Sequence, residues 1–176
     1  MKQKEIEIKL IFKNKNEIIN KLKPEIKLER KISIYDKYFS KDFLDMKNTH
    51  NLIRIRKINN NNDAELTFKS KTKNQGNIWQ RTELTTTIQS PEIMEKILTH
   101  LGFKKISEYK SQREYWKFQD LEIIFIKFTK PAFLEFMEIE GKPKKILEVI
   151  KKLGNNVKEV GEEIFEIFDL KRKGLN

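Results

Sequence analysis

The chain has 176 residues, the length of one domain, and is long enough to bury an apolar core. Apolar residues make up 38% of the sequence and charged residues 36%, which indicates a globular protein rather than a disordered one. No apolar run reaches the length of a membrane span, so we expect no membrane partner. The absence of cysteine excludes disulfide bonds and thiolate zinc sites, and favours a cytoplasmic location.

The formal net charge of +11 suggests a polyanionic partner. Runs such as Asn59 to Asn62 and the many lysines indicate a compositional bias, so part of this charge need only solvate the surface. Total charge does not distinguish a nucleotide from RNA or an anionic membrane. The positions of the charges along the chain have to make that distinction.

The periodicity of apolar residues predicts a protein that contains both strands and helices. In chain order we expect a strand over Glu5–Leu10, a helix over Asn16–Lys23, strands over Ser33–Phe39, Leu52–Ile58, Ala64–Lys71 and Ile78–Ile88, a helix over Pro91–Leu101, strands over Ser107–Phe118, Leu121–Phe128 and Phe133–Glu140, and helices over Pro143–Leu153 and Glu162–Leu170. Pro91 suits the first position of its helix, and Gly102 ends that helix.

The first predicted strand carries charges on one face. Glu5, Glu7 and Lys9 point one way, and the apolar residues between them point the other way. The same alternation recurs in the later strands, at Arg54 and Arg56, Glu65 and Lys69, Arg81 and Glu83, Arg113 and Lys117, and Glu138 and Glu140. An open antiparallel sheet would place all these charges in water. That arrangement explains the charged face of any one strand, but it does not explain why charged residues two positions apart recur in so many strands.

A closed barrel would explain why these charged faces recur. If the sheet closes with helices outside, the charged faces meet in one interior. Desolvated ions need partners of opposite charge. A polyphosphate would pair with the buried cations, and divalent cations would pair with the buried carboxylates. Carboxylates would coordinate Mg²⁺ or Mn²⁺, and the arginines and lysines would bind phosphate oxygens.

A series of short motifs follows one order along nearly the whole chain: Glu5-x-Glu7-x-Lys9, Asp36-Lys37-Tyr38-Phe39, Leu52-Ile53-Arg54-Ile55-Arg56, Leu66-Thr67-Phe68-Lys69, Arg81-Thr82-Glu83, Leu101-Gly102-Phe103, Arg113-Glu114-Tyr115 and Phe136-Met137-Glu138-Ile139-Glu140. This ordered set resembles the CYTH family of triphosphate-tunnel metalloenzymes, which includes class IV adenylate cyclases and thiamine triphosphatase. The Leu-Gly-Phe motif is similar to the class IV cyclase branch.

The resemblance implies an α+β fold, an eight-stranded antiparallel β-barrel with helices outside. Residues 1–170 would form a single domain, followed by a basic tail over 171–176. It implies five metal ligands, for Mg²⁺ or Mn²⁺: Glu5, Glu7, Glu83, Glu138 and Glu140. It also implies substrate-binding roles for Lys9, Arg54, Arg56, Lys69, Arg81 and Arg113, with catalytic roles for Lys9, Arg56 and Arg113.

Three positions depart from the pattern of that family. Thr85 stands where a second carboxylate is usual, and Ser111 where a lysine is usual, with Lys110 one residue away. Phe128 falls in the strand that usually brings an aspartate. A missing carboxylate would weaken a second metal site, so the departures affect the predicted activity more than the predicted fold.

The resemblance leaves two reactions open on a nucleoside, organic or inorganic triphosphate. One is a cyclase reaction that converts ATP to cyclic AMP and pyrophosphate, which we place slightly ahead. The other is hydrolysis, including that of thiamine triphosphate. A non-catalytic polyphosphate- or nucleotide-binding module is a third hypothesis. RNA binding is disfavoured because the aromatic residues do not form stacking platforms beside exposed cations. The oligomeric state stays open, a homodimer included.

Overall fold

The computed structural model describes residues 3–41, 51–59, 61–70, 73–75 and 78–160. Its strands are β1 (Gln3–Phe12), β2 (Ile26–Ser40), β3 (Leu52–Ile58), β4 (Ala64–Lys69), β5 (Lys73–Gln75), β6 (Ile78–Ile88), β7 (Lys104–Phe118), β8 (Leu121–Lys130), β9 (Leu134–Glu140) and β10 (Val157–Val160). Its helices are α1 (Lys15–Leu22), α3 (Pro91–His100), α4 (Pro143–Leu153) and a 3₁₀ turn over Gly154–Asn156.

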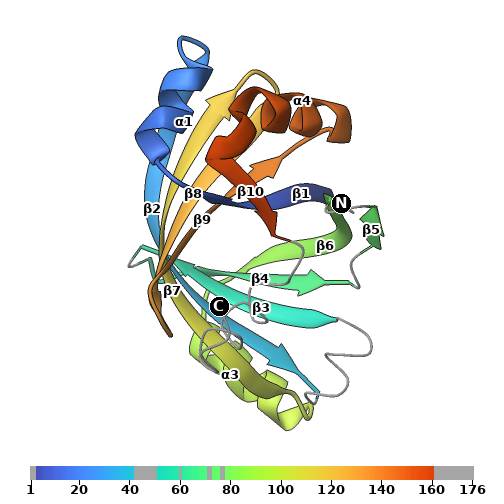
Figure 1. Ribbon diagram of the computed structural model, residues 1–176. Coiled ribbons are helices and arrows are strands. Elements are labelled where there is room, and N and C mark those ends of the chain that lie inside the picture. Colours follow the sequence, from blue (N-terminus) through green and yellow to red (C-terminus); the bar gives the residue numbers. More distant parts are fainter. Residues whose placement is uncertain (1–2, 42–50, 60, 71–72, 76–77, 161–176) are drawn as a thin grey trace.

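Eight of the strands form a closed antiparallel ring (Figure 1), in the order β1-β9-β8-β7-β2-β3-β4-β6. Strand β1 closes the ring because it pairs with β9 through Glu7↔Glu140 and with β6 through Glu5↔Arg81. The short strands β5 and β10 add to β6 and β1 respectively. The predicted eight-stranded antiparallel barrel is therefore confirmed.

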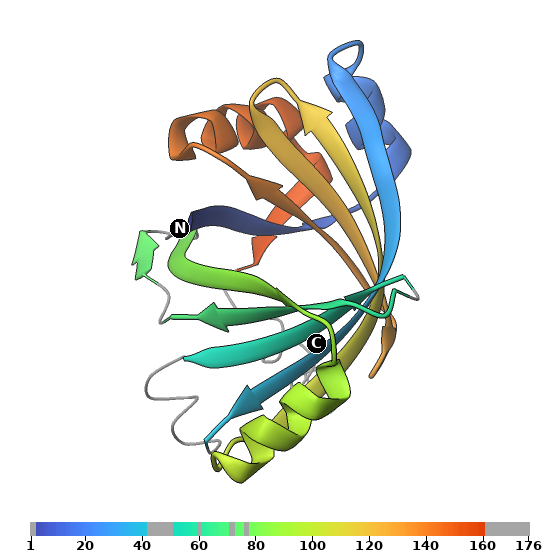
Figure 2. The same cartoon turned by 180° about the vertical axis from the view of Figure 1, so that it is seen from behind.

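The helices cover the outside of this ring. Helices α1 and α4 lie at one end and α3 at the other, in both views of the molecule (Figures 1 and 2). The outward residues of β1, such as Ile8 and Leu10, form a buried core with Ile18 of α1 and Ile146 of α4. Because these apolar side chains face outwards, the alternating charged side chains face the interior. In the described part of the chain, no helix is both long and apolar enough to cross a membrane.

The structure extends several predicted elements. Strand β2 begins at Ile26, not Ser33, and pairs with β7 along nearly its whole length. The short strands β5 and β10 were not predicted. The predicted helix over Glu162–Leu170 and the basic tail over 171–176 lie outside the described residues.

Candidate functional site: a charged cavity inside the barrel

The ring encloses a cavity of about 450 Å³. Residues from β1, β2, β3, β4, β6, β7, β8 and β9 line it, so every strand of the ring contributes. The charged members of the lining are Glu7, Lys9, Arg30, Asp36, Arg54, Arg56, Glu65, Lys69, Arg81, Glu83, Arg113, Glu122, Glu138 and Glu140. Charges of both signs are thus concentrated in one partly enclosed space, where their interactions are stronger than in water.

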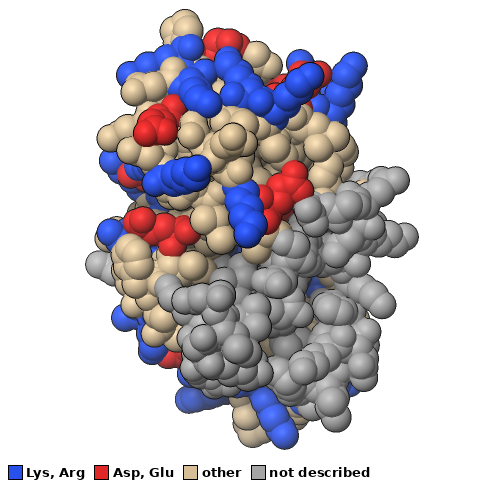
Figure 3. Space-filling view, viewed as in Figure 1, with Lys and Arg blue, Asp and Glu red and all other residues tan. Residues whose placement is uncertain are grey.

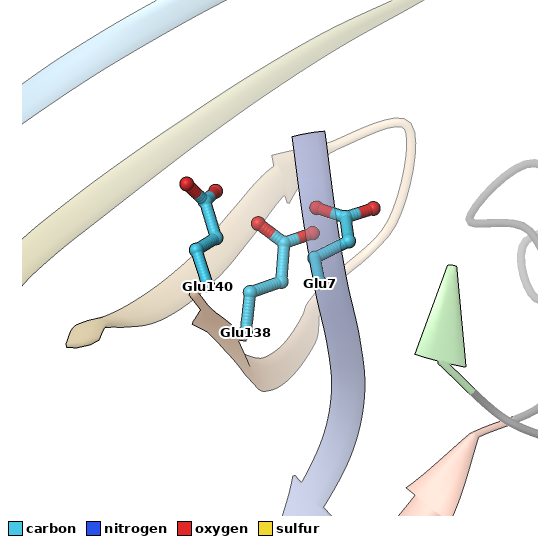
Figure 4. A group of neighbouring side chains, drawn as sticks. All are labelled: Glu7, Glu138 and Glu140. Atoms are coloured by element: carbon cyan, nitrogen blue, oxygen red, sulfur yellow. The ribbon is translucent and has the colours of Figure 1, made fainter. Parts of the chain in front are cut away.

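Three carboxylates converge at β1 and β9. Glu7 lies opposite Glu140 in the strand pair, and Glu138 is one step further along the same face of β9. One carboxylate oxygen from each of the three lies within 4.8 Å of the other two (Figure 4). Glu7 and Glu138 are buried and Glu140 is half-buried. Carboxylate oxygens are the ligands that Mg²⁺ and Mn²⁺ prefer, so the donor set fits such an ion.

The cations beside these carboxylates are held in ion pairs. Lys9 Nζ lies 2.8 Å from Glu7 Oε1, and both side chains are buried. Arg81 reaches Glu7 at 3.7 Å and Glu83 at 3.1 Å. Glu83 also accepts a hydrogen bond from Lys69. Glu83 is therefore bound to cations and is not part of the carboxylate trio.

Asp36 is the charged centre of the opposite wall. It accepts two hydrogen bonds from Arg56, each 2.8 Å long, and lies 3.9 Å from Arg113. Arg113 in turn lies 3.9 Å from Glu138, so it connects this wall with the carboxylate trio. Burial alone would raise the pKa of the Asp36 carboxyl, but Arg56 outweighs that effect and holds the pKa well below its usual range.

Arg54 differs from these cations. Its Nη2 donates to Thr67 Oγ1 at 3.2 Å, and Thr67 shares a second hydrogen bond with Thr85 at 3.1 Å. The Nε of Arg54 is buried and has no hydrogen-bond partner among the residues that the structure describes. Thr85, the position without the usual carboxylate, thus belongs to a neutral hydroxyl pair beside a guanidinium.

Aromatic rings line the cavity beside Arg54. Tyr38, opposite Arg54 in the β2–β3 pair, contacts Tyr109 edge to face at a centroid distance of 5.6 Å. Tyr109 contacts Phe128 at 5.7 Å, and Phe128 stacks on Phe136 at 5.6 Å. Burial, followed by the Asp36 charge, raises the pKa of the Tyr38 hydroxyl. Phe128 therefore supplies an apolar surface to the cavity from β8, the strand in which the resemblance leads us to expect an aspartate.

The structure brings together every predicted site residue whose side chain it describes. These residues all line the cavity: Glu7, Lys9, Arg54, Arg56, Lys69, Arg81, Glu83, Arg113, Glu138 and Glu140. Glu5 lies in β1 opposite Arg81, and its side chain is outside the described part. Ser111 accepts a long hydrogen bond from Arg113, at 3.5 Å.

Sequence reasoning assigned no role to Asp36, Tyr38 or Thr67. Asp36 and Tyr38 are two residues apart on one face of β2, and Thr67 alternates with apolar residues in β4. That alternation was the available signal, because it places each of them on the charged face.

The outer surface carries a different pattern of charge. Lysines and arginines far outnumber acidic groups over α1 and α4 (Figure 3). Exposed Lys144, Lys151 and Lys152 belong to α4. Much of the net positive charge therefore lies on the outside, whereas the cavity holds both signs.

The fold and the site define a closed antiparallel β-barrel with a partly enclosed cavity of paired charges. The CYTH domain model matches residues 3–169, and the chain belongs to that family. No protein with a curated description matches the chain significantly.

Solved structures share this fold. The PH1012 protein of Pyrococcus horikoshii is 25% identical, with a TM-score of 0.72 over 92% of this chain and 98% of its own. A conserved hypothetical protein of Pyrococcus furiosus is also 25% identical, with a TM-score of 0.71 and the same two coverages of 92% and 98%. A candidate adenylyl cyclase of Hippeastrum with a dominant triphosphatase activity is 17% identical, with a TM-score of 0.70 over 97% of this chain and 96% of its own. The last likeness shows the fold alone.

Proposed function

We propose that this protein is a metal-dependent enzyme that acts on a triphosphate bound inside the barrel. One observation carries the proposal: a carboxylate trio and several buried cations line the same cavity. Membership of the CYTH family supports it, because members of that family in general act on triphosphates with metal ions. A structural protein has no need for this many buried charges, whose desolvation is costly.

Glu7, Glu138 and Glu140 are the residues that would hold the metal ion. When bound, a divalent ion there would neutralise charge on the phosphate oxygens and orient the triphosphate. Lys9 and Arg81 contact Glu7 in the free protein. They would be released to bind phosphate oxygens once the carboxylates have another partner.

Arg56 and Arg113 would position the phosphate chain from the opposite wall. Asp36 fixes the Arg56 guanidinium through two hydrogen bonds and leaves its remaining donors for the ligand. Phosphoryl transfer depends mainly on positioning and on charge stabilisation, so a rigid guanidinium is suited to it.

The sequence places the cyclase reaction slightly ahead, but with the cavity in view we place hydrolysis of the triphosphate first. Hydrolysis requires only a water molecule beside a phosphorus atom, and this cavity supplies the charge stabilisation that it needs. A cyclase reaction also requires a pocket that holds the base and ribose. The rings of Tyr38, Tyr109 and Phe128 favour that second candidate, because a planar base can pack against an aromatic surface.

Phosphorus NMR distinguishes these reactions directly. The protein would be incubated with Mg²⁺ or Mn²⁺ and either ATP or inorganic triphosphate. Orthophosphate indicates hydrolysis, pyrophosphate with cyclic AMP indicates the cyclase, and binding without turnover indicates a non-catalytic module. Absence of both turnover and binding would refute the proposed function.

A further inference from the structure

The outer face of β3, β4 and β6 is only partly covered by α3. Phe68 of β4 and Leu84 of β6 are directly opposite in their strand pair and are 36% and 44% exposed. They line a hollow of about 210 Å³ on the outside of the barrel, together with Ile53, Leu66, Thr85 and Thr86. Ile53 and Leu66 also pack against the core cluster of Leu98 in α3, so the hollow reaches the helix. Each residue that lines this hollow is uncharged.

Helix α3 carries a second exposed apolar surface beside the hollow. Ile93, Ile97 and Leu101 are spaced four residues apart, so they form one stripe, and they are 44–64% exposed. Glu95 pairs with Lys37 of β2, so that side of the helix faces β2. Ile93 and Ile97 lie about half a turn away from Glu95, on the side of β4 and β6. The stripe and the hollow therefore form one surface, the α3 face, made of Ile53, Leu66, Phe68, Leu84, Thr86, Ile93, Ile97 and Leu101.

The size of the α3 face fits an interface between proteins. Phe68, Leu84, Ile93, Ile97 and Leu101 together expose roughly 500 Å², because a large apolar side chain offers about 200 Å² when it is fully exposed. A stable interface covers about 800 Å² on each partner, of which about 65% is apolar in homodimers. Single exposed apolar residues are ordinary, but a contiguous patch of this size in general marks an interaction site.

The distribution of charge indicates which partner fits. Lysines and arginines are concentrated over α1 and α4, at the opposite end of the barrel from α3 (Figures 1 and 3). In α3, the charges of Glu92, Glu95 and Lys96 nearly balance. Copies of a chain with a net charge of +11 repel each other, so they associate best through an uncharged surface far from the basic end. A polyanion such as RNA would instead favour the basic end.

We propose that the α3 face joins two copies of this chain around a two-fold axis. In such a dimer the same surface of each copy meets the other, so every contact occurs twice. The stripe of one copy would lie in the hollow of its partner, and the partner's stripe would lie in the hollow of the first copy. The inference is independent of the reaction in the cavity, because the α3 face is on the outside of the barrel.

Sedimentation velocity of the full chain over a range of concentrations tests this inference. Ile97→Lys changes the stripe, and Leu84→Lys changes the hollow. Both wild-type side chains are 44% exposed, so a lysine has room in the monomer. The matched control is Leu147→Lys, which makes the same change at a 52% exposed position of α4. Thermal unfolding followed by circular dichroism shows whether each variant is folded.

We expect the wild-type protein to dimerise with a dissociation constant in the micromolar range or tighter. Ile97→Lys and Leu84→Lys should each weaken the dimer by about tenfold or more, because each places two unpaired charges in the interface. Leu147→Lys should change the dissociation constant by less than about twofold. A dimer that both of the first two variants leave intact would overturn the proposal, because assembly would then use another surface.

A wild-type protein that is monomeric at every concentration would overturn the proposal as well. An apolar fluorescent dye would then show what becomes of the α3 face. Strong binding of the dye, lost in Leu84→Lys, would leave the face open to a different protein. Weak binding would place the face under another segment of the same chain. Both results exclude a second copy as the occupant.

Discussion

Asp36 binds Arg56 through both of its carboxylate oxygens, at 2.8 Å each. The two residues are directly opposite in the pair of β2 and β3, so the backbone register sets their geometry. Both side chains are nearly inaccessible to solvent, at 2% for Asp36 and 10% for Arg56. This pair anchors the wall of the cavity that faces the carboxylate trio.

Replacing Asp36 by asparagine should destabilise the protein. The substitution keeps the shape of the side chain but leaves the Arg56 charge buried without a counterion. Loss of one partner of a buried ion pair costs about 3 kcal/mol or more. We expect this loss in the free energy of unfolding, measured by urea titration. Glu135→Gln, in an exposed ion pair with Lys127, is the control and should change the value by less than about 1 kcal/mol.

The effect of Asp36→Asn should depend on pH. Arg56 lowers the pKa of Asp36 in the folded protein below its value of about 3.9 in the unfolded chain. The ionised carboxylate therefore stabilises the fold fully above that unfolded pKa, and this contribution is lost as the pH falls towards the folded pKa. The difference in stability between wild type and variant should shrink below about pH 4. A difference that stays constant from pH 7 to pH 3 would contradict the pairing.

Glu138→Gln should abolish tight metal binding and leave the barrel folded. The amide removes one charge from the trio, so we expect Mn²⁺ affinity to fall by about tenfold or more. Electron paramagnetic resonance of Mn²⁺ measures the bound fraction directly. Glu135→Gln lies on the same strand, outside the cavity lining, and should bind Mn²⁺ like the wild type. Turnover should be lost in Glu138→Gln, and also in Glu7→Ala.

Lys9→Met should have opposite effects on the two ligands. Lys9 is paired with Glu7 and would compete with a metal ion bound there, so its removal should raise Mn²⁺ affinity in the absence of triphosphate. The same change removes a cation that we propose binds phosphate, and it should weaken triphosphate binding in Mg²⁺. Each effect should be about fivefold or more. Lys127→Met, at an exposed position of β8, should change neither affinity. Parallel loss of both affinities in Lys9→Met would contradict the exchange of partners.

Gly141 sets the position of Glu140, its neighbour. Its φ of +146° is rarely adopted by other residues, and a Cβ there would overlap the buried side chain of Leu121. Gly141→Ala should therefore lower stability by about 2 kcal/mol and weaken Mn²⁺ binding. Gly102→Ala is the control, because its φ of +85° is also positive but a Cβ there would meet no atom within 4 Å. It should lower stability less and leave Mn²⁺ binding unchanged.

The strands that carry the site could be predicted because their two faces differ. Over Glu5–Leu10 of β1 and Glu138–Glu140 of β9, charged residues alternate with apolar ones. The structure places Glu7, Lys9, Glu138 and Glu140 in the cavity lining. The first part of β2 lacks this difference between faces, because the side chains of Lys27 to Lys31 are all exposed. Only backbone pairing with β7 makes this segment a strand. Strands β5 and β10 have three and four residues, too few for a period to be seen.

The partners inside the cavity could not be predicted. Periodicity places Asp36, Arg54 and Arg56 on inward faces, but it contains no information on the register between strands. That register decides that Asp36 meets Arg56 and that Arg54 meets Thr67. The sequence therefore predicts which residues enter the cavity, and long-range pairing decides which of them remain available to a ligand.

The pairing of Glu7 with Glu140 also has a consequence for how the protein is made. The ribosome synthesises β1 early and β9 much later, so the proposed metal-binding carboxylates meet only after most of the chain has emerged. Contacts so distant in sequence form slowly, because a long loop must close first. A nascent chain cut short before β9 would have no carboxylate trio. Metal binding at this site would therefore require that the chain is synthesised past β9 and folded. A partly synthesised chain would not bind the ion at this site.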